Sequence, residues 1–455
     1  MRETLVKTED FKDSPVGRIP KDWELRKLTD IASYQNGKSF PSLDYSESGR
    51  PLLRPGNLPD DDFVLWDEAH TTYLPLKWAE LAPDYIVLGE ELVMNLTAQS
   101  LDDQFLGRVC MTPPDTFCLL NQRIARFRAK DCYLPFLFWA LKGTYFRAQI
   151  DRIPQGTKVQ HIYNSDLDAI ILPMPKEQSE QRAITEILFT LSALVRSQES
   201  LIAKLKQMKA GLLHDLLTRG LDENGELRDA IGNPEQFKDS PLGQIPKDWE
   251  VESLDTVCLN VVDCPHTTPV FRTEGVLVAR TSNIRDGIFD VPASSYISEQ
   301  EYRQRITRLE PQLGDIVFTR EAPVGEAFVI PEGMRICLGQ RTMLLRPSPE
   351  KAHPGYLLAQ IYSGAVRVRI NQLVGGTTNP HLNVGEVRSF LLPVPPLGEQ
   401  AQIASVLDTH NDYIRAEEAY RDKLKLQKKG LMHDLLTGKV RVKDADKFTP
   451  ASDTV

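Results

Sequence analysis

Two short segments contain residue types that often bind phosphate or metal, and neither completes the pattern that its chemistry requires. The segment NGKSF, residues 36–40, is similar to the end of a phosphate-binding loop, but Ala32 stands where that loop needs a glycine. Cys258, Cys264 and His266 are close in sequence, but a fourth ligand at a spacing that suits zinc is missing. We therefore expect neither segment to bind a nucleotide or a metal.

Among the residues that do acid–base chemistry, one histidine recurs in two similar segments. His214 lies in GLLHDLLT and His433 lies in GLMHDLLT, and an aspartate follows each. Both segments stand near the ends of predicted long helices, where a cation interacts favourably with the helix dipole. A catalytic role would require matched sets of acid, base or nucleophile in both halves, and only His161/His381 recur besides this pair, without a convincing partner. We interpret both histidines as helix-capping or partner-contact residues and predict that the chain is not an enzyme.

The bulk composition is typical of a globular protein with more than one domain. A chain of 455 residues is too long for a single hydrophobic core, and its 41% apolar and 26% charged residues are ordinary values. The sequence contains no apolar run long enough for a membrane span, so we expect a cytoplasmic location with the six cysteines reduced. The net charge of −9 argues against a uniformly basic nucleic-acid-binding protein, but a local basic surface is compatible with it.

The sequence contains a long internal repeat. FKDSPVGRIPKDWE, residues 11–24, returns as FKDSPLGQIPKDWE, residues 237–250, with twelve of fourteen positions identical. Fainter matches keep the same order between the two copies: LLRPGN and VARTSN, LNQR and LGQR, ILPMP and LLPVP, SEQRAITEIL and GEQAQIASVL. A repeat of this length is a duplicated half-protein and not a solenoid. The tryptophan of each KDW is expected to anchor the first strand of its half.

Each half ends in a long stretch with helical periodicity. Residues 177–217 contain one glycine and no proline, and apolar residues recur there at three- and four-residue spacing; residues 399–436 repeat the pattern with more polar positions. We expect two helices of about 60 Å that pair as an antiparallel coiled coil. The residues predicted to mediate helix pairing or partner binding are Ile184, Leu188, Leu191, Leu205, Leu212, Ile403, Leu407, Leu424 and Leu431.

Two divergent globular parts joined by two long similar helices, with ILPMP/EQRAI and LLPVP/EQAQI joints, resemble the specificity (S) subunit of type I restriction–modification systems. The resemblance covers essentially the whole chain. It implies an α+β protein with a pseudo-twofold internal repeat, in which each of two target recognition domains reads one half of an asymmetric, bipartite site in double-stranded DNA. It also implies two methyltransferase (M) subunits and restriction/translocase (R) subunits as partners. No cofactor is expected on this chain, and AdoMet, ATP and Mg are expected on the partner subunits.

The repeat and the helical segments predict six parts of the chain. They are target recognition domain 1 with its lead-in (1–175), the first spacer helix (176–220), a linker with the repeated lead-in (221–250), target recognition domain 2 (251–396), the second spacer helix (397–438) and a polar tail (439–455). Short β-branched segments such as 275–281 and 314–320 predict strands. The segments 135–150 and 354–370, each starting with proline, predict one helix each.

Polar residues that recur in both domains are the best candidates for DNA contact, together with the basic run that contains Arg126. The candidates are Arg54, Asn57, Gln122, Arg123, Arg126, Thr157 and Lys158 in domain 1, and Arg280, Asn283, Gln340, Arg341, Thr377, Thr378 and Asn379 in domain 2. The recurring Gln–Arg pair has an alternative interpretation as a buried pair that holds the fold. The acidic run at 60–62 is expected to face away from DNA. A coiled-coil adaptor without direct DNA recognition is the alternative function.

Overall fold

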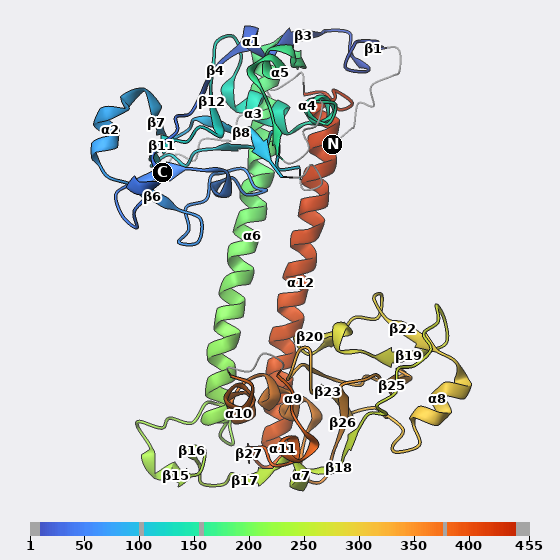
Figure 1. Ribbon diagram of the computed structural model, residues 1–455. Coiled ribbons are helices and arrows are strands. Elements are labelled where there is room, and N and C mark those ends of the chain that lie inside the picture. The colour runs from blue at the N-terminus through green and yellow to red at the C-terminus, as the bar shows by residue number, and fades with distance from the viewer. Residues whose placement is uncertain (1–9, 100–103, 154–158, 376–379, 443–455) are drawn as a thin grey trace. The chain divides into compact units, whose positions relative to one another are not determined.

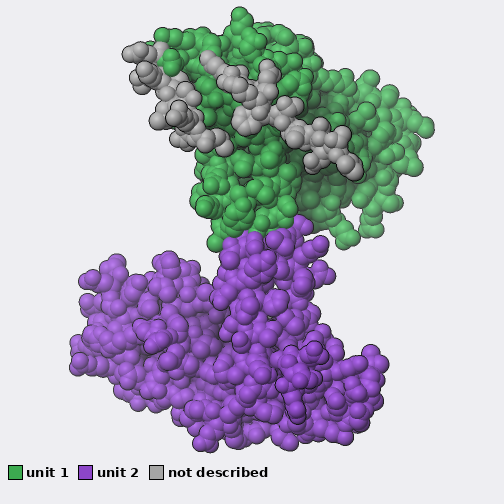
Figure 2. Space-filling view, turned by 180° about the vertical axis from the view of Figure 1, so that it is seen from behind, with its two compact units in different colours: residues 1–199, 419–455 green, residues 200–418 purple. Residues whose placement is uncertain are grey.

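The computed structural model describes residues 10–99, 104–153, 159–375 and 380–442. These residues form two compact units (Figure 2). Unit 1 comprises residues 1–199 and 419–455, and unit 2 comprises residues 200–418. Both boundaries fall within long helices, so each unit contains one part of each helix.

Two long helices are present, as the apolar spacing predicts (Figure 1). Helix α6 spans Gln178–Thr218 and helix α12 spans Leu397–Leu436. A glycine with left-handed backbone follows each helix, Gly220 with φ of +64° and Gly438 with φ of +71°. Glycine adopts this conformation without the strain that a Cβ atom introduces, so both helices end within the same repeated segment, HDLLT, shortly before a glycine.

The domain in unit 1 is built around two four-stranded sheets, ordered β10-β8-β12-β4 and β6-β5-β11-β7. Apolar side chains from both sheets, among them Leu53, Val93 and Ile124, form a shared core. The strands are β1 (Phe11–Lys12), β2 (Ile19–Pro20), β3 (Trp23–Lys27), β4 (Ala32–Asn36), β5 (Arg50–Leu53), β6 (Thr72–Leu74), β7 (Ile86–Leu88), β8 (Leu92–Asn95), β9 (Thr97–Ala98), β10 (Val109–Met111), β11 (Phe117–Leu120), β12 (Ile124–Ala129), β13 (Gln160–His161) and β14 (Ile171–Pro175). The shorter helices are α1 (Leu28–Ile31), η2 (Ser42–Asp44), η3 (Pro55–Asn57), α2 (Lys77–Leu81), η4 (Pro83–Tyr85), α3 (Leu134–Lys142), α4 (Thr144–Ile150) and α5 (Asn164–Ala169).

The domain in unit 2 repeats this topology. Its sheets are ordered β24-β23-β26-β18 and β22-β19-β25, which match β10-β8-β12-β4 and β6-β5-β11 of unit 1. The strands are β15 (Phe237–Ser240), β16 (Gly243–Pro246), β17 (Glu250–Ser253), β18 (Cys258–Asp263), β19 (Val276–Ala279), β20 (Ile284–Arg285), β21 (Ile288–Phe289), β22 (Ser295–Ile297), β23 (Ile316–Thr319), β24 (Ala327–Val329), β25 (Ile336–Leu338), β26 (Thr342–Pro347) and β27 (Leu391–Val394). The shorter helices are η5 (Pro234–Gln236), α7 (Leu254–Val257), η6 (Thr281–Asn283), α8 (Glu299–Arg305), α9 (Pro354–Tyr362), α10 (Ala365–Val374) and α11 (Val384–Arg388).

The predicted strands at 275–281 and 314–320 are confirmed as β19 and β23, whereas the two predicted proline-led helices are each broken into two. Helices α3 and α4 are separated by Gly143, whose ψ of 165° is extended. Helices α9 and α10 are separated at Gly364, which has a φ of 78°. The apolar periodicity continues across both breaks. For this reason the sequence pattern predicted one continuous helix in each domain, although a glycine interrupts the helix there.

The repeated lead-in of each half packs against the end of the long helix from the other half. In unit 1, β3 pairs with β14, and the buried Trp23 shares a core with Leu436 of α12. In unit 2, β17 pairs with β27, and the buried Trp249 shares a core with Leu217 of α6. The tryptophans are therefore packing anchors, as the sequence predicts.

The glutamine of each EQ segment fixes the start of its long helix. The side-chain amide of Gln181 donates to the carbonyl of Pro175 at 3.0 Å, and its oxygen accepts from the backbone of Tyr133 at 3.1 Å. Gln400 makes the matching bonds to Pro395 at 2.9 Å and to the backbone of His353 at 2.8 Å. One side chain thus joins the helix start to the preceding strand and to the α3 or α9 helix start.

An arginine after each long helix completes the joint. In unit 1, Arg441 donates to both carboxylate oxygens of the buried Glu180, at 2.7 and 2.8 Å, and to those of Asp22, at 2.7 and 2.9 Å. Bidentate arginine–carboxylate pairs of this kind are stronger and more directional than single hydrogen bonds. We call this three-residue arrangement the arginine clamp of unit 1.

Unit 2 contains the same arrangement. Arg228 donates to Glu399 at 2.6 and 3.1 Å and to Asp248 at 2.9 Å. Trp249 also donates its indole N–H to Glu399, at 3.1 Å. The aspartate of each KDW and the glutamate of each EQ are therefore the two anions of a clamp, which explains why both phrases are kept in the two halves.

Asp62 joins domain 1 to the parts of both long helices that belong to unit 1. Its carboxylate is fully buried and lies 2.8 Å from the ammonium groups of Lys142 and Lys428 and 3.5 Å from the guanidinium of Arg196 on α6. Burial alone would raise the pKa of Asp62, and the nearby lysines outweigh this effect and lower the pKa to about 2. The acidic run at 60–62 is expected to face away from DNA; the structure adds that Asp62 is a buried, paired carboxylate of the domain interior.

No helix among the described residues combines the length and the apolar character that a membrane span requires.

Candidate nucleic-acid interface

In unit 1, a pair of parallel strands brings two of the candidate segments together. Strand β11 runs parallel to β5, with Leu120 opposite Leu53. Arg54 follows β5 and the turn containing Gln122 follows β11, so both emerge at the same edge of the sheet. The backbone N–H of Asn121 donates to the carbonyl of Leu53 at 3.2 Å, which fixes the approach of the two segments.

Unit 2 brings the equivalent segments together in the same way. Strand β25 runs parallel to β19, and the N–H of Gly339 donates to the carbonyl of Ala279 at 2.9 Å. A Cβ atom on Gly339 would lie 2.5 Å from that carbonyl oxygen, so this close approach requires glycine. Arg280 and the turn containing Gln340 and Arg341 therefore lie beside each other.

A third repeated segment joins this edge. In unit 1, Leu96 donates to the carbonyl of Arg123 at 2.9 Å, and Ile162 donates to the carbonyl of Leu96 at 2.9 Å. In unit 2, the backbone N–H of Arg320 donates to the carbonyl of Arg341 at 2.8 Å, and the backbone N–H of Leu382 donates to the carbonyl of Arg320 at 3.1 Å. Ile162 and Leu382 each follow a Gly–Thr segment. The candidates in those segments, Thr157, Lys158, Thr377, Thr378 and Asn379, lie outside the described residues.

The recurring asparagines are buried and hold the chain that follows each arginine. The side-chain oxygen of Asn57 accepts from the backbone of Arg54 at 2.9 Å, and its amide donates to the carbonyl of Leu65 at 3.2 Å. Asn283 donates to the carbonyl of Ala293 at 2.8 Å. Both asparagines shape the loop from within the protein, and their contact with DNA stays a prediction.

The recurring Gln–Arg turns lie at the surface and not in the interior. Gln122, Arg123 and Arg341 are exposed, and Gln340 is half-buried. Gln340 donates to the carbonyl of His266 at 3.1 Å, and Arg341 lies 3.2 Å from a carboxylate oxygen of Glu321. The alternative interpretation, a buried Gln–Arg pair, is therefore not what the structure contains.

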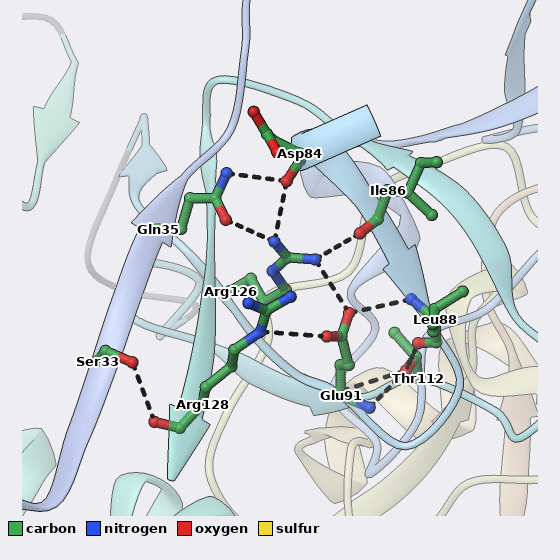
Figure 3. A network of polar contacts seen from close by, with 9 residues as sticks. All are labelled: Ser33, Gln35, Asp84, Ile86, Leu88, Glu91, Thr112, Arg126 and Arg128. Carbon is green, nitrogen blue, oxygen red and sulfur yellow. Dashed lines mark hydrogen bonds and ion pairs between the residues drawn. The ribbon is translucent and has the colours of Figure 1, made fainter. Parts of the chain in front are cut away.

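Arg126 is buried, unlike the other basic residues of its run. Its guanidinium donates to the side chain of Gln35 and to the backbone carbonyls of Asp84 and Ile86, and it lies 3.4 Å from a carboxylate oxygen of Glu91 (Figure 3). Strand β12 is an inner strand between β8 and β4, and both of its faces are covered at this point. We therefore assign Arg126 to the interior of domain 1 and not to its surface, so its position does not suit the predicted DNA contact.

The arginines at the strand ends each stack on an aromatic side chain, which the sequence analysis did not identify. The guanidinium carbon of Arg54 lies 5.5 Å from the ring centre of Tyr45, and that of Arg280 lies 4.8 Å from the ring centre of Phe271. Arg54 donates to the hydroxyl of Thr72 at 2.7 Å, and Arg280 donates to that of Ser295 at 3.2 Å. The pattern aromatic-x3-Gly-x4-Arg occurs in both halves and could have revealed the stack.

The predicted pairing residues of the first part of α6 and the last part of α12 lie together in unit 1. Ile184 and Leu188 are fully buried in a core that also contains Leu435, with Leu431 packed against it. Leu424 is buried, and Leu191 is half-buried.

In unit 2, the remaining pairing residues behave similarly. Ile403 and Leu407 of α12 share a core with Leu216 of α6, and Leu212 packs against this core. Leu205 is buried.

The other segments that suggested chemistry form no site in the described residues. Cys258 and Cys264 are buried, and the ring of His266 lies 3.1 Å from Asp263. Within the described ranges, no three histidine, cysteine, aspartate or glutamate side chains converge in a way that could hold a metal ion.

The chain belongs to the family of type I restriction modification DNA specificity domains, whose model matches it twice, over residues 20–207 and 246–426. The type I restriction enzyme MjaVIII specificity subunit of Methanocaldococcus jannaschii is 25% identical over 458 residues, covering 97% of this chain and 98% of the relative. The EcoBI specificity subunit of Escherichia coli is 24% identical over 400 residues, covering 85% of this chain and 78% of the relative. The crystal structure of a type I S subunit from M. genitalium has the same fold, with a TM-score of 0.56, 13% identity, and coverage of 96% of this chain and 99% of that chain.

Proposed function

We propose that this chain is the DNA-specificity subunit of a type I restriction–modification complex. Its two domains would each read one half of a bipartite, asymmetric site in double-stranded DNA. The observation that carries the proposal is the double match to the specificity-domain family, one match in each half of the chain. The matching topology of the two units supports it, because it provides two similar scaffolds whose surface residues differ.

The DNA-facing surface of each domain would be the edge where the three repeated segments meet. In domain 1 it would include Arg54, Gln122 and Arg123, and in domain 2 Arg280, Gln340 and Arg341. Arginine suits this role because it can bind phosphate and the edge of guanine with the same planar group. Residues of this edge that differ between the domains would read the two different half-sites.

The two long helices would form an antiparallel coiled coil that sets the distance between the half-sites and docks the other subunits. Within unit 1, Glu199 of α6 pairs with Lys425 of α12 at 2.6 Å, and Ile184 shares a core with Leu435. Residue numbers therefore rise along α6 where they fall along α12, as in an antiparallel pair. Within unit 2, Lys206 pairs with Glu418 at 2.6 Å, and Leu216 shares a core with Ile403. A helix of about 60 Å corresponds to at most about 18 base pairs.

The complex would contain two methyltransferase subunits, one for each of the two similar joints, together with restriction/translocase subunits. AdoMet, ATP and Mg would be bound by those subunits, and this chain would contribute recognition without catalysis. The six-part division, with domains at 1–175 and 251–396 and spacer helices at 176–220 and 397–438, would describe the functional boundaries.

Methylation mapping tests the proposal. The chain would be co-expressed with the methyltransferase subunit encoded beside it, and modified adenines would be located on plasmid DNA by long-read sequencing. We expect a gapped, asymmetric motif, and exchange of residues 251–371 for those of a relative should change only one half of that motif. A palindromic or ungapped motif would contradict the two-domain proposal. Absence of methylation from a folded complex would favour an adaptor role.

A further inference from the structure

We propose that the stacked arginines, Arg54 in domain 1 and Arg280 in domain 2, bind DNA phosphates and not bases. This inference rests on the proposed function and assigns a specific role to one part of the proposed interface. It concerns two three-residue groups, which we call the arginine stacks: Tyr45, Arg54 and Thr72 in unit 1, and Phe271, Arg280 and Ser295 in unit 2.

The two stacks are equivalent in detail. The aromatic residue precedes the arginine by nine positions in both halves, and a glycine with positive φ lies between them, Gly49 at +126° and Gly275 at +128°. A Cβ atom on either glycine would lie 2.3 or 2.2 Å from a carbonyl oxygen of the neighbouring strand. The same backbone path is therefore required in both domains to place the aromatic ring beneath the guanidinium.

The stacks present charge and aromatic surface outward. Tyr45 is 37% exposed and Phe271 is 41% exposed. Within the described part of the chain, neither Arg54 nor Arg280 has a carboxylate oxygen within the 4.0 Å of an ion pair, whereas Arg335 and Arg346 are paired with Glu299 and Asp315. The stack and the hydrogen bond to the hydroxyl fix the position of the guanidinium but do not neutralise its charge. A positioned, charged guanidinium with further N–H donors is suited to binding a phosphate.

The recurrence of the stacks separates phosphate contact from base reading. A residue that reads a base is expected to differ between the two domains wherever their half-sites differ in sequence. A residue that binds the backbone meets the same chemical group in both half-sites and can stay the same. Arg54 and Arg280 keep their type, their stacking partner class and their hydroxyl acceptor, although most residues of the surrounding segments differ between the domains.

The test is a salt titration of DNA binding by the full chain assembled with its methyltransferase subunit. The variants Arg54→Ala and Arg280→Ala would be measured on a duplex with the methylated motif and on an unrelated duplex. We expect each variant to weaken binding to both duplexes by a similar factor and to reduce the slope of log affinity against log salt by about 0.9. Between 50 and 200 mM salt, the factor by which affinity falls should then be about 3-fold smaller for the variant than for the wild type. The sequence motif that the complex methylates should stay unchanged.

The chain offers a matched control. Arg335 also stacks on an aromatic ring, 4.4 Å from the ring centre of Tyr302, but it is paired with Glu299. Arg335→Ala should therefore leave the slope unchanged. Arg54→Lys should keep the slope, because it keeps the charge. If Arg54→Ala unfolds, Arg54→Gln removes the charge and keeps most of the side chain, and Arg280→Ala tests the second stack independently.

Three results would overturn the inference. They are an unchanged slope in a folded variant, a loss confined to the duplex with the motif, and a methylated motif that relaxes in one half. The last two would make the arginines base readers. The wild-type complex is measured first. If it shows no sequence-specific binding, the proposed function is overturned and not only this inference.

Discussion

Replacing Asp62 with asparagine removes the single negative charge that three cations of unit 1 share, and the structure gives the size of the expected effect. The pKa of Asp62 is lowered from 3.8 to about 2. At about 1.4 kcal/mol for each pKa unit, this shift corresponds to about 2 kcal/mol of stability at pH 7. Asparagine cannot replace this charge, but the side chains of Lys142, Lys428 and Arg196 are 18%, 20% and 37% exposed, so water compensates them partly.

We therefore expect Asp62→Asn to lower the free energy of unfolding by about 2 to 3 kcal/mol, below the range for a fully buried ion pair that loses one partner. For a unit of this size the melting temperature should fall by roughly 4 to 10 °C. Urea unfolding followed by fluorescence and circular dichroism measures the difference. The exposed Asp60 provides the matched control, and Asp60→Asn should change stability by less than about 0.5 kcal/mol.

The pH dependence of this difference tests the electrostatic explanation itself. A carboxylate with a lowered pKa stabilises the folded state fully above the pKa of the unfolded chain, and this contribution is lost as the pH falls toward the folded-state pKa. For Asp62 the difference between wild type and variant should be nearly complete at pH 5 and about half as large at pH 3. Equal stability of Asp62→Asn and wild type at pH 7 would refute the reasoning. So would a difference of full size at pH 3, because it would point to packing and not to charge.

Three further predictions follow from the joints and the cores. Arg441→Met should destabilise unit 1 by about 1 to 3 kcal/mol in urea unfolding, because the buried Glu180 loses its counterion. Gly220→Ala should cost at least about 1 kcal/mol by the same measurement, since the backbone φ is +64° and a Cβ atom would lie 2.3 Å from the ring of Trp249. Burial raises the pKa of Cys110 to about 12, so this thiol should resist alkylation at pH 8 in the folded protein and react once urea unfolds it.

The predictions for Arg441 and Gly220 each have a control in the chain. Arg415 forms an exposed pair with Asp412 one helical turn away, and Arg415→Met should change stability by less than about 0.5 kcal/mol. Gly430 lies within α12 with no neighbour in reach of a Cβ atom, so Gly430→Ala should stabilise the protein by about 0.5 to 1 kcal/mol. Equal effects of the two glycine substitutions, or rapid alkylation of Cys110 in the native state, would contradict the structure.

The sequence predicted those features that depend on local periodicity and on the repeat. The helices at 178–218 and 397–436 follow from three- and four-residue apolar spacing, and the strands β19 and β23 from short β-branched runs. Trp23 and Trp249 were identified as packing anchors because their phrase recurs. These signals need only residues that are close in sequence or written twice.

Features that depend on partners distant in sequence could not be predicted in this way. Arg126 occupies a basic, alternating run that suggests a surface strand, but its partner Glu91 comes from another part of the domain and β12 lies between two other strands. Asp62 belongs to an acidic run that was expected only to face away from DNA, and its cations come from α3, α6 and α12, which are distant in sequence. The arginine stacks were different, since the shared spacing between the aromatic residue and the arginine was readable from the two halves.

The two arginine clamps join the same residue types but differ in the length of chain between their members. Arg228 and Asp248 are 20 residues apart along the chain, whereas Arg441 and Asp22 are 419 apart. The chain therefore closes a short loop at the clamp of unit 2 and a very long one at the clamp of unit 1. Loop-closure entropy makes the long connection costlier by about 3 kcal/mol from a fully unfolded chain. We therefore expect the clamp of unit 2 to form first, and the clamp of unit 1 to be the one that opens first when the protein is warmed.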